Sequence, residues 1–213
     1  MSQSSSDRNL GQSPFAALRR FVRPRAAAIE QCEMCSAPLA ADHQHLIEIN
    51  RRQLACACDA CAILFSGQAE TKYKRVPRRI RYLSDFHLTD AQWDGLRLPI
   101  HLAFFFKSTP EGREVALYPS PAGPIESLLA LDTWDEIVAE NAILKEMLPD
   151  VEALLVNRVG STREHYLVPI DECYKLVGLI RAHWRGLSGG TEVWTEIGRF
   201  FETLKARASE KDR

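Results

Sequence analysis

The chain has 213 residues, of which 46% are hydrophobic, and its formal net charge is −1. This is enough for one main domain and a small module, and no apolar run approaches the roughly 18 residues that a membrane-spanning helix needs. The charge is unevenly placed: residues 1–83 hold 13 Lys+Arg and 7 Asp+Glu, whereas residues 84–213 hold 14 and 21. We therefore expect a basic N-terminal part and an acidic C-terminal part.

Residues 1–28 begin with a Ser/Gln-rich stretch and continue with several arginines. Such a composition would also suit an organellar transit peptide, and Arg19-Arg20 resembles part of a twin-arginine export signal. However, Arg23, Pro24 and Arg25 stand where the apolar stretch of that signal should begin. The sequence favours a flexible basic tail over residues 1–28.

Residues 29–83 contain five of the six cysteines, as Cys32-x-x-Cys35 and, 20 residues later, Cys56-x-Cys58-x-x-Cys61. Two Cys-x-x-Cys pairs at this separation can each supply one edge of a tetrahedron, the geometry of a closed structural zinc site. We therefore predict a cysteine-rich metal-binding module with one zinc ion held by Cys32, Cys35, Cys58 and Cys61. Iron is the alternative metal, because tetrahedral sulfur ligation suits both ions.

Three more potential ligands lie in this module, Cys56, His43 and His45, in addition to the four that one zinc site needs. Cys56 lies two residues before Cys58, so it is either a buried thiol beside the site or a replacement for Cys58 as a ligand. His43 and His45 share a face if the segment is extended, as a second metal would require, but imidazoles at the surface of a hairpin are more common. Cys56, His43 and His45 are therefore our less favoured ligands.

The segment between the two cysteine pairs predicts a short β-hairpin, with alternating residues at 45–49 and 53–56 and a turn between them. Residues 58–65 have helical composition. A knuckle, a hairpin and a helix that carries the second cysteine pair are typical of a treble clef, and we predict a zinc treble clef or zinc ribbon.

Disulfide bonds are a poor explanation for the clustered cysteines. Disulfide-rich chains are small and secreted, whereas this chain is long enough for its own core and shows no usable secretory signal. The sixth cysteine, Cys173, shares an apolar helical stripe with Leu176, Val177 and Ile180, so we expect it to pack in the core. We expect a cytoplasmic protein.

A basic run follows the metal module, with no acidic residue inside it: Lys72, Lys74, Arg75, Arg78, Arg79 and Arg81. One interpretation is nucleic-acid binding through phosphate neutralisation. The other, which we favour, is docking on the acidic second domain, because Tyr73, Val76, Ile80 and Tyr82 interleave with the charges.

Residues 84–208 predict an α+β domain, an antiparallel sheet with helices, followed by a disordered tail at 209–213. Strands are expected at 98–107, 113–118, 151–158 and 163–168. A helix is expected to begin at an Asp132-Thr133 N-cap and to end near Pro149, and two more should span 169–184 and follow Thr191. Residues 118–124 predict a rigid loop that is either a docking surface or a plain connector.

We expect no enzymatic activity, because the sequence contains no recognisable catalytic constellation. The hairpin preceded by Asp42-His43 resembles that of an HNH-type nuclease. In such nucleases an Asn or His follows the second knuckle, whereas this chain has Ala62, Ile63, Leu64 and Phe65. Hydrolysis would therefore lack a complete metal site.

From about Cys32 to Ala206, the chain resembles an uncharacterised bacterial domain family encoded beside the genes of high-affinity NiFe-hydrogenases. The resemblance is carried by six segments, at residues 32–39, 43–46, 56–61, 118–123, 167–171 and 183–186. It implies a part in the assembly, maturation or function of the hydrogenase, with a hydrogenase subunit or maturation protein as partner. We therefore expect a non-catalytic metal-binding accessory protein; the alternatives are a nucleic-acid-binding zinc protein and an iron-binding electron-transfer protein.

Overall fold

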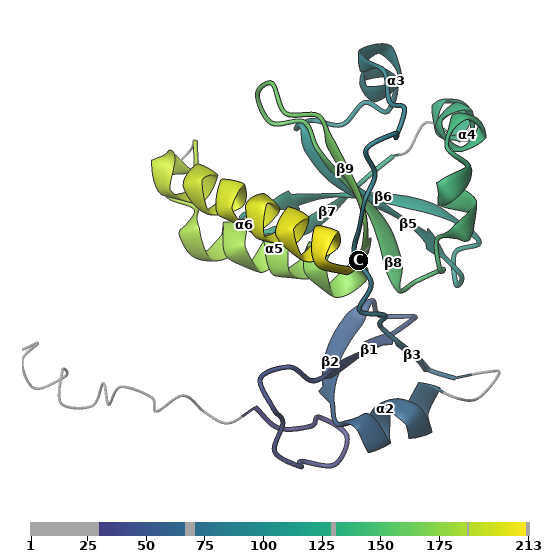
Figure 1. The fold of residues 1–213 in the computed structure, drawn as a ribbon, viewed down its shortest axis with the longest axis vertical. Coiled ribbons are helices and arrows are strands. Elements are labelled where there is room, and N and C mark those ends of the chain that lie inside the picture. The colour runs from purple at the N-terminus through teal and green to yellow at the C-terminus, as the bar shows by residue number, and fades with distance from the viewer. Residues whose placement is uncertain (1–29, 67–70, 129–130, 187, 212–213) are drawn as a thin grey trace, which may run out of the picture.

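The computed structural model describes residues 30–66, 71–128, 131–186 and 188–211, which form a mixed α+β structure with two antiparallel sheets (Figure 1). The tail predicted at residues 1–28 lies outside the described residues. The smaller sheet belongs to the cysteine-rich module, and the larger one to the main domain. No helix among the described residues combines the length and apolar character needed to cross a bilayer.

The module is built around the predicted hairpin, which is confirmed: β1 (Gln44–Glu48) pairs antiparallel with β2 (Gln53–Ala57). The connecting turn ends at Arg52, which has a positive φ of 53°. The helix α2 (Asp59–Ser66) follows directly, as predicted. A third strand, β3 (Tyr73–Arg75), lies in the basic run and pairs with the other edge of β1, so that the strand order is β2-β1-β3.

The main sheet has six strands in the order β4-β9-β8-β5-β6-β7, with every neighbouring pair antiparallel. Its four central strands are those predicted from the sequence, with shifted ends: β5 (Leu102–Ser108), β6 (Arg113–Ser120), β8 (Glu152–Asn157) and β9 (Glu164–Pro169). The edges are β4 (Arg81–Tyr82) and β7 (Gly123–Ser127). Strand β4 comes from the basic run, so this run contributes to both sheets.

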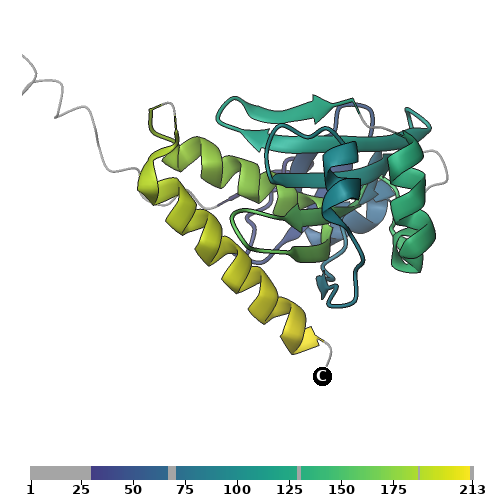
Figure 2. The same ribbon diagram turned by 90° about the horizontal axis from the view of Figure 1, so that it is seen from above.

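Helices cover both faces of the main sheet (Figures 1 and 2). On one face lie α5 (Ile170–His183) and α6 (Gly190–Lys211); on the other lie α3 (Asp90–Gly95), α4 (Leu131–Glu140) and the 3-10 helix η1 (Ala142–Glu146). The alternation along β5 explains this arrangement, because side chains alternate between the two faces of a strand. Phe104 and Phe106 pack with residues of α5 and α6, whereas Phe105 stacks on Trp134 of α4 with ring centroids 5.0 Å apart.

The long helix predicted from Asp132 to near Pro149 is wrong in its extent, because α4 begins at Leu131 and ends at Glu140. Asn141 interrupts the helix: its backbone leaves the helical region (φ −125°, ψ 84°), and its side-chain amide donates to the carbonyl oxygens of Ile137 and His87. No local signal in the sequence predicts the contact with His87, because this residue lies 54 residues from Asn141 and meets it only in the fold.

The loop predicted at residues 118–124 is also wrong. These residues form the end of β6, a tight turn and the start of β7, in which Gly123 has φ 126° and Pro119 lies opposite Pro124. Pro124 is tolerated because β7 is an edge strand and its outer side needs no N–H donor. Pro119 lies beyond Leu117, the last residue of β6 that pairs with β5.

The connection between α5 and α6 depends on Gly189. This residue has φ 86°, and a Cβ atom there would lie 2.8 Å from Val193 Cγ1 and 3.1 Å from the ring of Trp184. A side chain would therefore collide with the packing of the two helices. Cys173 is fully buried between α5 and the sheet, as predicted. Helix α6 extends through residues 209–211 of the predicted tail.

The basic run joins the module to the main domain through ion pairs. Lys74 binds Asp150 at 2.5 Å, Arg79 binds Glu152 at 3.3 Å and Arg81 binds Glu146 at 3.0 Å. The carboxylates of Asp150 and Glu152 are almost completely buried. Such carboxylates need a compensating charge, and the basic run supplies it.

One histidine of the core, His165 of β9, is buried and stacks on Phe86 with ring centroids 4.8 Å apart. Burial, followed by the nearby charges of Arg158 and Arg163, lowers its pKa to about 4. The folded protein therefore keeps this ring neutral at pH values at which the unfolded chain protonates it.

We predict that stability falls as the pH is lowered from about 6.5 to about 4, because the unfolded state then binds a proton that the folded state does not. The contribution of one such group is at most about 1.4 kcal/mol per pH unit. His165→Gln should remove this contribution, as measured by urea unfolding at a series of pH values. His101→Gln, which removes an exposed imidazole, is the control; an identical pH dependence in all three proteins would contradict the prediction.

Candidate metal centre

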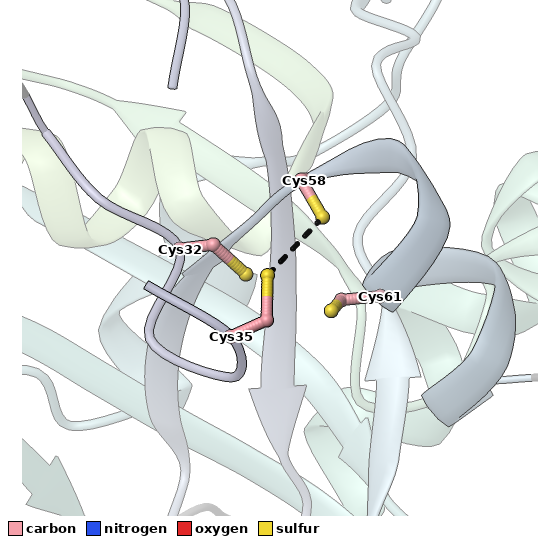
Figure 3. Close-up of side chains that lie close together, drawn as sticks. All are labelled: Cys32, Cys35, Cys58 and Cys61. Atoms are coloured by element: carbon pink, nitrogen blue, oxygen red, sulfur yellow. Dashed lines mark hydrogen bonds between the residues drawn. The ribbon is translucent and has the colours of Figure 1, made fainter. Parts of the chain in front are cut away.

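Four cysteine side chains from two separate segments converge in the module (Figure 3). Cys32 and Cys35 lie in the loop before β1, Cys58 lies between β2 and α2, and Cys61 lies in the first turn of α2. Their four sulfur atoms all lie within 4.8 Å of one another, and the sulfur atoms of Cys35 and Cys58 are 3.8 Å apart. The structure thus brings together the four residues that the sequence predicts as ligands.

The loop that carries Cys32 and Cys35 is held by backbone hydrogen bonds. The Cys32 N–H donates to the Ala37 carbonyl, and the Ser36 N–H donates to the Cys32 carbonyl, with Ser36 in the left-handed region at φ 61°. Glu33 attaches this loop to β2: its N–H donates to the Cys56 carbonyl, and its carboxylate accepts from the Cys56 N–H at 2.7 Å. These contacts place the first cysteine pair beside the second.

The size of the cluster suits a tetrahedral metal ion. Sulfur ligands at about 2.3 Å from zinc lie about 3.8 Å from one another along a tetrahedron edge. The separation of Cys35 and Cys58 agrees with that edge. All six cysteines of the chain are free thiols, so the four are not joined as disulfides. The thiols present therefore fit a single ion with four sulfur ligands.

The electrostatics of the cluster also favour a bound cation. Burial raises the pKa of Cys32, but hydrogen bonds from the backbone, the largest at Cys58, outweigh it and lower this pKa to about 6. Burial, followed by hydrogen bonds to the neighbouring thiols, raises the pKa of Cys61 to about 12. The Cys32 thiolate therefore forms easily, whereas the Cys61 thiol resists ionisation unless a cation compensates its charge.

Two of the four cysteines, Cys32 and Cys61, belong to a small apolar core on one face of the hairpin, together with Leu46, Ala57 and Ala62. Cys35 is exposed. A core of this size is insufficient to stabilise a fold alone, and small modules usually need a metal or disulfides in addition. The four-cysteine cluster is therefore in the position where a structural metal would stabilise the module most.

The three less favoured ligands do not join this cluster but form a second one. One ring nitrogen of His43, one of His45 and the sulfur of Cys56 lie within 4.8 Å of one another. The two imidazole rings meet edge to face, with centroids 4.9 Å apart.

A residue of the main domain, Asp171, contacts this second cluster. Its carboxylate accepts from Nδ1 of His45 at 2.7 Å, across 126 residues of sequence. This hydrogen bond raises the pKa of His45, although burial opposes it. In the sequence, Asp171 is only an acidic residue near the start of the helix expected at 169–184, and no local pattern connects it to His45.

A separate apolar cleft of about 360 Å³ lies on the main domain, between the β6–β7 hairpin and the two C-terminal helices. Tyr118 and Pro121 line one side, and Trp184 and Trp194 line the other. Trp194 is 45% exposed and meets Trp184 edge to face with centroids 6.3 Å apart. Residues 118–121, predicted as part of a loop, therefore form a wall of this cleft.

The described residues define a mixed α+β protein with a cluster of four cysteines that is compatible with metal binding. The chain belongs to the family of unknown function DUF5947, whose model matches residues 31–208. No curated protein and no solved structure matches the chain.

We predict that Cys35→Ser and Cys61→Ser each release the metal of the four-cysteine site and unfold residues 30–66, while the helices of the main domain persist. The reason is that the module has its own small core, separate from the two cores of the main domain. Elemental analysis of the desalted protein and amide hydrogen exchange would measure the two effects.

Cys173→Ser is the control matched to Cys61→Ser, since it also removes a buried thiol but lies in the main core. It should keep the metal and lower the free energy of unfolding by about 1 kcal/mol or somewhat more. Equal metal loss from all three variants would show that the ligand assignment is wrong.

Proposed function

We propose that this protein is a non-catalytic metal-binding accessory protein, in which a zinc-stabilised module and the α+β domain together present a surface to a partner protein. The observation that carries the proposal is the convergence of four thiols on one point of a module with a very small core. A site with four protein ligands leaves no coordination position for a substrate, which is typical of a structural metal.

Zinc is our proposed ion for the four-cysteine site. Zinc has no preferred geometry from its d electrons and is the usual ion in closed tetrahedral thiolate sites. The order of the elements, a loop with one cysteine pair, a hairpin and a helix with the second pair, is also that of zinc treble clefs. Binding of such an ion contributes on the order of 10 kcal/mol or more to the folding of a small module.

The proposed partner is a hydrogenase subunit or maturation protein in the cytoplasm, as the family resemblance implies. The apolar cleft supports a protein contact, because aromatic residues at the rim of an apolar depression are typical of binding hot spots. Two segments that carry the resemblance, residues 118–123 and 183–186, contribute to the cleft although they are 60 residues apart. We propose that an apolar segment of the partner binds there.

The nucleic-acid alternative is weakened by the contacts of the basic run. Three of its side chains form ion pairs with the main domain, and Lys72 and Arg78 bind Glu48 and Asp42 in the module. The charge of these residues is therefore largely compensated within the chain. The contacts agree better with intramolecular docking than with phosphate binding.

We predict that elemental analysis of the protein, purified anaerobically, finds zinc in the four-cysteine site and no visible charge-transfer bands. Bound iron with such bands would favour the electron-transfer alternative. Tight DNA or RNA binding, with log affinity falling against log salt by about 0.9 per phosphate contact, would favour the nucleic-acid alternative. In that case Arg78→Glu, Arg79→Glu and Arg81→Glu together should abolish the binding.

We further predict that the protein co-purifies with a hydrogenase subunit or maturation protein from cells that make that enzyme, and that its deletion lowers hydrogen uptake without changing transcript levels. Trp194→Ala should weaken recovery of the partner about 10-fold or more, because it removes an exposed aromatic side chain of the cleft. Leu148→Ala, at a similarly exposed leucine elsewhere, should leave recovery unchanged. Normal hydrogen uptake in the deletion strain, with no partner recovered, would refute the proposed role.

A further inference from the structure

The cluster of His43, His45 and Cys56 lies on the face of the hairpin opposite the small apolar core of the metal module. In the register of the sheet, His45 stands directly opposite Cys56, so their side chains share a face. Leu46 and Ala57, each one residue further along, point to the other face and pack with Cys32 and Cys61. The two clusters therefore use opposite sides of the same two strands.

Hydrogen bonds indicate which ring nitrogen of each neutral histidine carries the proton. Nδ1 of His43 lies 2.9 Å from the carbonyl oxygen of Ala40, which can only accept, so Nδ1 carries the proton. The lone pair is then on Nε2. This atom is buried, has no hydrogen-bond partner among the described residues, and belongs to a side chain that is only 7% exposed.

His45 has the same arrangement, with a carboxylate in place of the carbonyl. Its Nδ1 lies 2.7 Å from Oδ2 of Asp171, which leaves Nε2 of the neutral ring with a lone pair. Histidines that bind metals almost always donate their other N–H to a carboxylate or a backbone carbonyl, because this orients the ring and strengthens the donor nitrogen. Both rings fulfil this condition, each with a different acceptor.

Asp171 is well placed for this role. It lies in the first turn of α5, where the partial positive charge of the helix N-terminus stabilises a carboxylate. Its second oxygen, Oδ1, is buried and has no hydrogen-bond partner among the described residues. The site thus contains two buried polar atoms without a hydrogen-bond partner among the described residues, Nε2 of His43 and Oδ1 of Asp171. A bound cation would accept the lone pair of the nitrogen and balance the charge of the carboxylate.

We propose that His43, His45 and Cys56 form a second metal site, which binds a transition-metal ion that accepts nitrogen and sulfur donors, such as zinc or copper. Asp171 orients His45 in this site and is a positioning residue. Three protein ligands leave one coordination position open. The two histidines and Asp171 also line a cleft of about 430 Å³, through which an exogenous ligand can reach the ion. The inference goes beyond the proposed function, because it requires neither the partner nor a particular ion in the four-cysteine site.

The test uses the full-length protein as purified under reducing conditions, saturated with Zn²⁺ and desalted. We expect two metal ions per chain in the parent protein and one in His45→Ala and in Cys56→Ser. His87→Ala, which removes an exposed histidine paired with Glu140, and Cys173→Ser should both retain two. Asp171→Asn should lower the affinity of the second site for its metal ion about 10- to 100-fold.

A second measurement needs no variant and so is independent of any failure to fold. One equivalent of Co²⁺ is added to the purified protein, and proton NMR is used to find paramagnetically shifted, exchangeable N–H signals. We expect two such signals, one from Nδ1 of each histidine. One metal ion per chain in the parent protein, with no shifted imidazole signals, would overturn the second site while leaving the four-cysteine site intact. His45→Ala and Cys56→Ser leave the four cysteines of the other site in place, so that loss of one ion in these variants concerns the second site alone. A parent protein that binds no metal at all would instead contradict the four-cysteine site, so the two failures are distinguishable.

Discussion

The alternation of side chains along the β1–β2 hairpin is the constraint on which the arrangement of this protein depends. One face of the hairpin carries Leu46 and Ala57, which pack beneath the four cysteines, and the other carries Ile47, which packs into the main core. A shift of register by one residue would exchange the two faces and separate both groups from their partners. The contacts of Glu33 with Cys56 reinforce the register, because they fix the edge of β2.

Elements with their own periodic pattern could be predicted from the sequence, whereas elements that depend on distant partners could not. The hairpin carries alternation, and the central strands β5, β8 and β9 carry short apolar runs that are buried on both faces of the sheet. By contrast, β4 has only two residues and exists because it pairs with β9. Asn141 ends α4 through a bond to His87, which no local pattern reveals. Helix α3 did leave a signal, the Thr89-x-x-Gln92 capping box, but six residues are too few for a periodic pattern.

The same distinction applies to the candidate sites. The four cysteines could be predicted because the spacing of two Cys-x-x-Cys pairs reflects local geometry. The second cluster was visible only as excess ligands, since its defining contact joins His45 to Asp171 across 126 residues. The sequence of the basic run left two interpretations open, nucleic-acid binding and docking on the acidic second domain. Several of its charges compensate buried carboxylates of the main domain, including that of Glu152, which agrees with the docking interpretation. The ion pairs of Lys74, Arg79 and Arg81 therefore belong to the contact between the module and the main domain.

The two ends of the six-stranded sheet restrict how the protein can associate with others. Strand β4 is too short to act as a template, and β7 begins with Gly123-Pro124, where the proline offers no N–H group. Sheet edges of this kind resist the addition of a further strand from another chain, which is a common route to aggregation and domain swapping. Complexes that involve this sheet should therefore form through side-chain packing rather than through addition of a strand to its edges.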